Sequence, residues 1–128
     1  MSKVIKGFMV DVENRKAHPC EVERNLESYY GLLNCDLIDI TARKIGGKYY
    51  DIILDDEGLF KDNPIPAAFC EDGSPLVGNI LIVGLPDMND ENGYETSLSD
   101  ADIKEIARHI QFAFIDGKVF PILMGLEY

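Results

Sequence analysis

The pattern of apolar and polar positions predicts β-structure at the start of the chain. Residues 4–12 are rich in β-branched residues and alternate in part, which indicates a first strand. Residues 13–16 are polar and suit a turn. Residues 17–20 are expected to form a short return strand, and Pro19 within them indicates a position at a sheet edge.

Two segments carry apolar residues at helical spacing. Between Glu21 and Leu33 the spacing predicts a helix over residues 22–33, with Gly31 as a point where it could end early. A second helix is predicted over residues 99–114, with Gly117 as its stop. Its start resembles a capping box, with Asp in place of the usual Glu. The apolar stripes are Val22, Leu26, Tyr29, Tyr30 and Leu33 in the first helix, and Ile103, Ile106, Ala107, Ile110 and Phe114 in the second.

The middle of the chain predicts a hairpin and a buried strand. Two β-rich runs, 35–45 and 48–54, flank a Gly-Gly pair, which is a strong hairpin signal. Residues 67–70 suggest a short strand. The nearly continuous apolar run 76–84 predicts a central strand that is covered on both faces.

This order of elements predicts an α+β fold. The strands follow one another without regular helical crossovers, so we expect a mostly antiparallel sheet packed against about two helices. The apolar tail 118–128 is expected to add a final strand. No internal repeat or linker divides the chain, so residues 1–128 are expected to form a single domain.

The charge is large and unevenly placed. The chain has a net charge of −11. Residues 1–48 hold eight basic and seven acidic residues, a net charge of +1, whereas residues 49–128 hold four basic and sixteen acidic residues, a net charge of −12. Such a field repels phosphate backbones and argues against direct nucleic-acid binding. It favours a basic partner surface, of the kind that nucleic-acid-binding proteins carry, although acidity can also serve solubility alone.

The sequence contains no recognisable catalytic set. Neither a nucleophile elbow, an H-E-x-x-H motif nor a phosphate-binding loop is present, and His18 and His109 are the only histidines. A distant pairing of Cys35 or Cys70 with His109 stays open, but free thiols in a reducing compartment explain the cysteines. We therefore expect a binding protein and not an enzyme, with no catalytic residues and no cofactor.

The acidic runs predict no metal site. Consecutive strand residues point to opposite faces, so the turn Asp55-Asp56-Glu57 is expected to be solvated. The segment 87–93 fails as an EF-hand loop in either register, because the glycine or the first ligand falls at the wrong position. The N-terminus lacks a signal-peptide core and no run is long enough to span a membrane, so a cytoplasmic location without membrane contact is expected.

Several ordered motifs resemble a known family. They are the runs 34–39, 46–59, 76–84 and 97–100, which in this order resemble the domain-of-unknown-function 3846 family of phage, plasmid and conjugative-element proteins. The resemblance covers about residues 26–106. The proline-rich loop 63–67 and the apolar tail depart from it. It supplies no catalytic residues, and it implies a mobile element inside a bacterial cell, often near antirestriction genes.

Together these observations favour an acidic, protein-binding inhibitor of a host defence nuclease, of anti-CRISPR or antirestriction type, which could act as a DNA mimic. The alternatives are a non-inhibitory accessory or scaffold domain, and a binder of a small molecule or nucleotide signal with a pocket near Ser99. The partner would be a host protein with a basic nucleic-acid-binding surface, and a homodimer stays open. The candidate partner-binding residues are Asp55, Asp56, Glu57, Asp87, Asp90, Glu91, Glu95, Asp100, Asp102 and Glu105.

Overall fold

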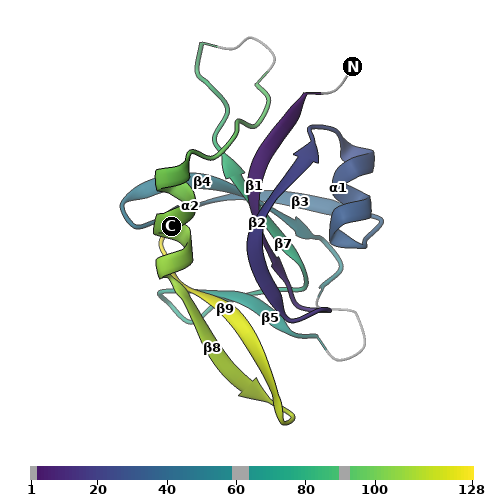
Figure 1. Ribbon diagram of the computed structural model, residues 1–128, viewed down its shortest axis with the longest axis vertical. Coiled ribbons are helices and arrows are strands. Elements are labelled where there is room, and N and C mark those ends of the chain that lie inside the picture. The colour runs from purple at the N-terminus through teal and green to yellow at the C-terminus, as the bar shows by residue number, and fades with distance from the viewer. Residues whose placement is uncertain (1–2, 59–63, 90–92) are drawn as a thin grey trace.

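A computed structural model describes residues 3–58, 64–89 and 93–128 of the chain (Figure 1). Within these residues strands predominate over helices, and the elements follow in the order β1 (Val4–Asp11), β2 (Lys16–Glu23), α1 (Leu26–Leu33), β3 (Ile38–Ile45), β4 (Lys48–Asp55), β5 (Pro66–Cys70), β6 (Pro75–Val77), β7 (Ile80–Gly84), α2 (Asp100–Arg108), β8 (Ile110–Ile115) and β9 (Lys118–Leu126). The predicted α+β class is confirmed.

The strands form two sheets where the sequence predicted one. The five-stranded sheet has the order β2-β1-β7-β4-β3 and is antiparallel throughout. The four-stranded sheet has the order β6-β5-β9-β8 and contains one parallel pair, β5 with β9. The expectation of mostly antiparallel pairing is therefore confirmed. The predicted hairpin around Gly46-Gly47 is also confirmed, and both glycines adopt the positive φ values that such a tight turn requires.

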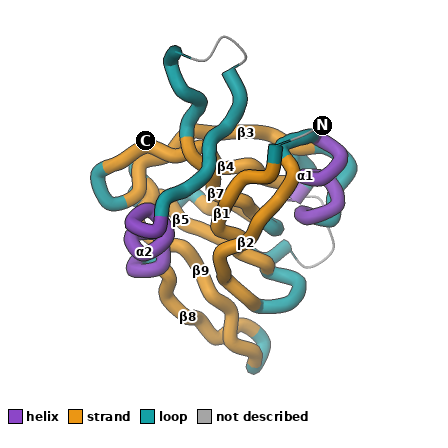
Figure 2. The backbone as a smooth tube through the Cα atoms, turned by 45° about the horizontal axis from the view of Figure 1, so that its top comes forward, coloured by secondary structure: helices purple, strands orange, loops and turns teal. Residues whose placement is uncertain are grey.

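The main core lies between the two sheets, with α2 closing one side of it (Figure 2). Ile52 of β4 and Ile82 of β7 meet Ala68 of β5 and Leu123 of β9, and Ile106 of α2 packs against the same cluster. All five side chains are fully buried. Apolar burial of this kind is the dominant favourable term in folding, so this cluster holds the two sheets together.

A second core lies on the other face of the five-stranded sheet. Tyr29 and Leu33 of α1 cover Ile53, Leu81 and Val83 of the central strands. The strand β7 is therefore buried on both faces, as its continuous apolar run predicted.

The run 76–84 is nevertheless not a single strand. It divides at Gly78 and Asn79 into β6, which belongs to the four-stranded sheet, and β7, which belongs to the other. Gly78 has a φ of +88°. The buried Asn79 accepts a 2.8 Å hydrogen bond from the Val12 amide and donates one of 3.2 Å to the Leu33 carbonyl. Apolar periodicity did not reveal this break because apolar residues flank it on both sides.

The first helix is shorter than predicted. Val22 is paired with Ile5 in the β1–β2 ladder, so its helical spacing from Leu26 was coincidental. The helix begins at Leu26, after Asn25 accepts a 2.8 Å hydrogen bond from the Ser28 amide as its N-cap. Gly31 does not end it. The helix continues to Leu33 and closes at Asn34 in the left-handed conformation.

The second helix is also shorter, although its predicted start is confirmed. Ser99 and Asp102 form a reciprocal capping box, with bonds of 2.8 and 3.1 Å. The helix ends at Arg108, and the segment predicted as its last turns is the strand β8. Gly117 lies in the β8–β9 turn. Tertiary pairing with β9 overrides the helical spacing of Ile110 and Phe114. In the described part of the chain, no helix combines the length and hydropathy that crossing a membrane requires.

Candidate functional site

The structure divides the predicted acidic residues between two ends of the five-stranded sheet. Strands β4 and β7 are antiparallel, with Tyr50 opposite Gly84 and Leu54 opposite Ile80. The segment that follows Gly84 therefore lies at the Tyr50 end of β4, whereas Asp55 ends the strand at the other end, roughly 17 Å away. The candidate residues do not form a single patch.

At the Tyr50 end of β4, Asp102 is a buried residue that stabilises the fold. Its side chain is 11% exposed and accepts hydrogen bonds of 2.9 Å from Lys48 Nζ and 2.8 Å from the Tyr50 hydroxyl. Burial alone raises the pKa of Asp102, but the bonds from the Ser99 backbone, Lys48 and Tyr50 outweigh it and lower the pKa to about 2. The expectation that Asp102 faces a partner is therefore corrected, because its bonding capacity is used inside the fold.

Two further acids at this end are opposed by cations. Lys6 lies 3.9 Å from Asp100, and Arg108 lies 3.3 Å from Glu105. Asp100 remains 88% exposed and Glu105 33% exposed. Ion pairs as exposed as the one between Lys6 and Asp100 contribute little to stability, but they reduce the local negative field.

The segment that returns to α2 is anchored through Glu95. Tyr29 donates a 3.1 Å hydrogen bond to the Glu95 carboxylate, and Arg24 donates one of 3.2 Å to the Glu95 carbonyl. The Arg24 guanidinium also stacks over the Tyr94 ring at 4.6 Å. Burial and the Glu95 charge raise the pKa of Asp51 on β4. Glu95 is therefore half-buried and held in place.

Asp87 is the exposed acid of the same segment, and it accepts a 2.9 Å bond from the Asn89 amide. Asp90 and Glu91 lie outside the described residues.

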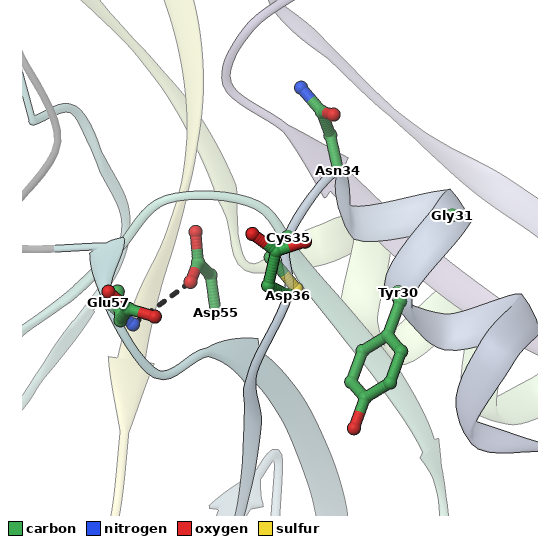
Figure 3. Close-up of a pocket in the computed structure, with 7 residues that line it drawn as sticks. All are labelled: Tyr30, Gly31, Asn34, Cys35, Asp36, Asp55 and Glu57. Atoms are coloured by element: carbon green, nitrogen blue, oxygen red, sulfur yellow. Dashed lines mark hydrogen bonds between the residues drawn. The ribbon is translucent and has the colours of Figure 1, made fainter.

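The opposite end of the sheet contains a pocket of about 430 Å³. Figure 3 shows its lining residues, which come from the last turn of α1, the α1–β3 connection and the end of β4. Three of them are carboxylates: Asp36, Asp55 and Glu57. Asn34 also lines the pocket and donates bonds of 3.0 and 3.2 Å to Glu13, which adds a fourth carboxylate beside it.

The acids around this pocket, together with the adjacent Asp56, differ in exposure. Asp55 is 3% exposed and accepts a 2.9 Å hydrogen bond from the Glu57 amide. It lies at the base of the turn, which corrects the expectation of a solvated side chain. Asp36, Asp56 and Glu57 are exposed. In the described part of the chain these three carboxylates take part in no ion pair.

Within the described ranges, no group of three or more His, Cys, Asp or Glu side chains is arranged to hold a metal ion. Chemically, the pocket is suited to a cationic group such as a lysine or arginine side chain. Glu13, Asn34 and Asp36 were not among the residues predicted for this site. The available signal was Asn34 directly after the helix, since Asn is common at a left-handed C-cap, where the chain turns out of α1 toward β3.

His109, Cys70 and Cys20 are accounted for by their local surroundings. The His109 ring lies 2.9 Å from the Glu105 carbonyl oxygen at the end of α2. Cys70 is buried in the main core. Burial raises the pKa of the Cys20 thiol to about 11, which keeps it protonated at neutral pH.

Two hollows flank α2, the helix beside which a small-molecule pocket was considered. One has a volume of about 530 Å³ and is lined by Lys6, Pro19, Cys20, Glu21, Asp100 and Ile103. The other, here called the apolar groove, has a volume of about 320 Å³ and lies between β2 and α2 with β8. Its apolar walls include Phe8, Ala17, Pro19, Ile103, Ala107 and Ile110.

Comparison with known proteins supports the family resemblance. No curated protein and no solved structure matches this chain. A family model described as "Domain of unknown function (DUF3846)" matches residues 5–111 of the 128. The match covers all strands of the five-stranded sheet except the first residue of β1 and ends within β8, so β9 and its core residues Leu123 and Leu126 lie beyond it. The chain therefore belongs to the DUF3846 family.

Proposed function

We propose that this chain is a binding protein, not an enzyme, and that it engages a basic protein surface through the pocket at the Asp55 end of β4. The observation that carries the proposal is the concave site itself: about 430 Å³, lined by Asp36, Asp55 and Glu57. A lysine or arginine side chain fits this volume, and carboxylates are its preferred partners. Asp87 at the other end of the sheet supplies a second, outlying contact.

The class of partner is inferred from the negative charge of the protein and from the mobile-element origin that the family resemblance implies. Surfaces rich in lysine and arginine occur mostly on proteins that bind nucleic acid, and carboxylates presented there take the place of phosphates. In the bacterial mobile-element setting that the resemblance implies, the partner is a host defence nuclease whose DNA contact the chain blocks. Supporting this is the net charge of −11, which attracts such a surface over long distances.

The test combines capture with inhibition. Immobilised wild-type protein is exposed to a bacterial lysate, and the captured proteins are identified by mass spectrometry. In parallel, purified restriction and CRISPR nucleases cleave DNA in the presence of increasing amounts of the protein. We expect one nuclease to be both captured and inhibited, and the association to weaken steeply as salt rises.

Three matched variants locate the interface. The pocket variant carries Asp36→Asn, Asp56→Asn and Glu57→Gln, all at exposed positions. The control variant carries Glu21→Gln, Glu23→Gln and Glu27→Gln, which are also exposed and remove the same charge. The loop variant carries Asp87→Asn, Asp90→Asn and Glu91→Gln.

Only the pocket variant is expected to lose most of its binding and inhibition. An equal loss of binding in all three variants would show that binding depends on the net charge of the protein and not on the pocket. Loss confined to the loop variant would move the interface to the other end of the sheet.

A further inference from the structure

The outer edge of β8 lacks the protection that free sheet edges usually have. β8 is the last strand of its sheet, and its sequence, Ile-Gln-Phe-Ala-Phe-Ile, contains no charged residue and no proline. Natural proteins protect such edges with charges, prolines or very short strands. The other described edge strands follow this rule: β2 contains Pro19, β3 contains Asp39 and Lys44, and β6 has three residues. Among the strands described, β8 is the exception.

The backbone of β8 presents unused hydrogen-bonding groups along this edge. The Met124 amide donates a 2.9 Å bond to the His109 carbonyl, so these two residues occupy a hydrogen-bonded position of the antiparallel β8–β9 pair. Hydrogen-bonded and non-bonded positions alternate along such a pair. The N–H and C=O groups of Ile110, Phe112 and Phe114 therefore point away from β9, toward the open side.

The side chains of the same residues form an apolar face. Phe112 is 73% exposed and Phe114 is 80% exposed. Val119, paired with Phe114 across the hairpin, is 40% exposed. Ile110 lies on the same face and lines the apolar groove, as does Phe112. Figure 1 shows this hairpin projecting at the end of the molecule opposite the segment that precedes α2.

We propose that β8 pairs with β8 of a second copy of this chain, antiparallel about a two-fold axis at Phe112. The outward groups belong to residues 110, 112 and 114, so these must occupy the hydrogen-bonded positions of the new pair. The register that uses all three places Phe112 opposite Phe112 of the second copy and Ile110 opposite its Phe114. This joins the two four-stranded sheets into one continuous sheet. It goes beyond the proposed function, which uses other residues.

The apolar groove provides a receptor for the second copy's phenylalanine. Because Phe114 of one copy lies opposite Ile110 of the other, it is placed beside the groove that Ile110 lines. The groove volume of about 320 Å³ can hold a phenyl ring. Phe112 and Phe114 of the two copies expose roughly 150 Å² each, about 600 Å² together, and the groove walls and strand edges that they cover add a comparable area. The buried total therefore reaches about 1,200 Å², the lower end of the range for stable interfaces.

The end of the molecule at the β8–β9 hairpin is suited to self-association because charges of both signs lie around it. Two copies with a net charge of −11 each repel one another over most of their surfaces. The turns that lie beside the hairpin carry both signs, since Glu13, Arg15, Asp116 and Lys118 line one hollow there. Together with Lys16 and its strand partner Asp11, the described charges of these turns are three cations and three carboxylates. The second copy is therefore the occupant that this face can accept without strong repulsion.

Sedimentation velocity over a concentration series tests the pairing. We expect the wild type to dimerise, and Phe112→Lys and Phe114→Lys each to raise the dimer dissociation constant at least about 30-fold, as for interface hot spots. Both residues are exposed, so the monomer fold should survive, which circular dichroism checks. Met88→Lys is the control, since Met88 is fully exposed and far along the chain from β8. A wild type that stays monomeric, or a dimer that both phenylalanine variants retain, overturns the proposal.

A cross-link tests the register. Across a hydrogen-bonded antiparallel position the Cα atoms are about 5.5 Å apart, within the reach of a disulfide. Phe112→Cys should therefore form a covalent dimer on mild oxidation. Gln111→Cys, one residue away and on the opposite face, should not. Equal linkage in both variants, or linkage in neither, contradicts the two-fold axis at Phe112.

Discussion

The hydroxyl group of Tyr50 donates a 2.8 Å hydrogen bond to the carboxylate of Asp102, which lies 52 residues later in the chain. This buried contact joins the beginning of β4 to the first turn of α2. Burial and the adjacent Asp102 carboxylate raise the pKa of Tyr50, so its hydroxyl remains a donor at neutral pH. The same carboxylate caps the helix, and a single side chain therefore fixes both where α2 begins and where it lies.

Replacing Asp102 with alanine should destabilise the protein in a pH-dependent way. At pH 7 the variant loses a cap and two side-chain hydrogen bonds, an effect on the order of 2 kcal/mol. Because the folded-state pKa of Asp102 is lowered to about 2, its stabilisation is complete above the unfolded-state value and is lost as pH falls through about 2. Urea unfolding of both proteins between pH 7 and pH 2 measures this. A difference that stays constant over the range would contradict the role of the charge.

Asn79 is predicted to be a critical residue of the junction between the sheets. Replacing it with alanine leaves the Val12 amide and the Leu33 carbonyl without their bonds in a buried site. Each such group costs about 1–3 kcal/mol, so we expect a loss of roughly 2–6 kcal/mol in unfolding free energy. Asn89→Ala, at an exposed position, is the control and should change stability by less than about 0.5 kcal/mol. Equal effects of the two substitutions would show that the two Asn79 hydrogen bonds do not stabilise the junction between the sheets.

Glu95 is predicted to control two neighbouring ionisations. Burial and Glu95 together raise the pKa of Tyr29 and that of Asp51. In Glu95→Gln both pKa values should fall, while staying above their usual ranges because burial persists. Carbon NMR follows Asp51, and absorbance titration follows Tyr29, with Tyr29→Phe to assign the transition. Asp87→Asn should leave both unchanged. An unaltered Asp51 titration in Glu95→Gln would mean that the two carboxylates do not interact.

Divalent cations are not expected to bind the pocket at the Asp55 end of β4. The exposed Asp36 and Glu57 are suited to a cationic side chain and are not converged on one point with Asp55. Millimolar calcium or magnesium should therefore leave the melting temperature nearly unchanged, relative to the same protein with a chelator. A saturable rise of several degrees, abolished in Glu57→Gln, would instead identify a metal site.

The sequence by itself determined those features whose signals are local. The Gly46-Gly47 turn and the Ser99 capping box depend on neighbouring residues and are present as predicted. The apolar run 76–84 correctly predicted that β7 is buried, but not the break at Gly78 and Asn79. Backbone conformational preference and short-range capping decide such features wherever the segment lies in the fold. The family resemblance also rested on ordered local motifs, and the match to residues 5–111 confirms it.

The tertiary structure decided what depends on pairing between distant segments. Val22 belongs to a strand and not to the predicted first helix, because it pairs with Ile5 of β1. Phe114 likewise belongs to a strand and not to the predicted second helix, because it pairs with Val119 of β9. The acidic residues were separated because the antiparallel register of β4 and β7 sends Asp55 and Asp87 to opposite ends of the sheet. The spacing of residues along the chain indicates which side chains could lie on the same face of a helix or strand. The register of long-range strand pairs determines which of them do, because a one-residue shift reverses every side chain.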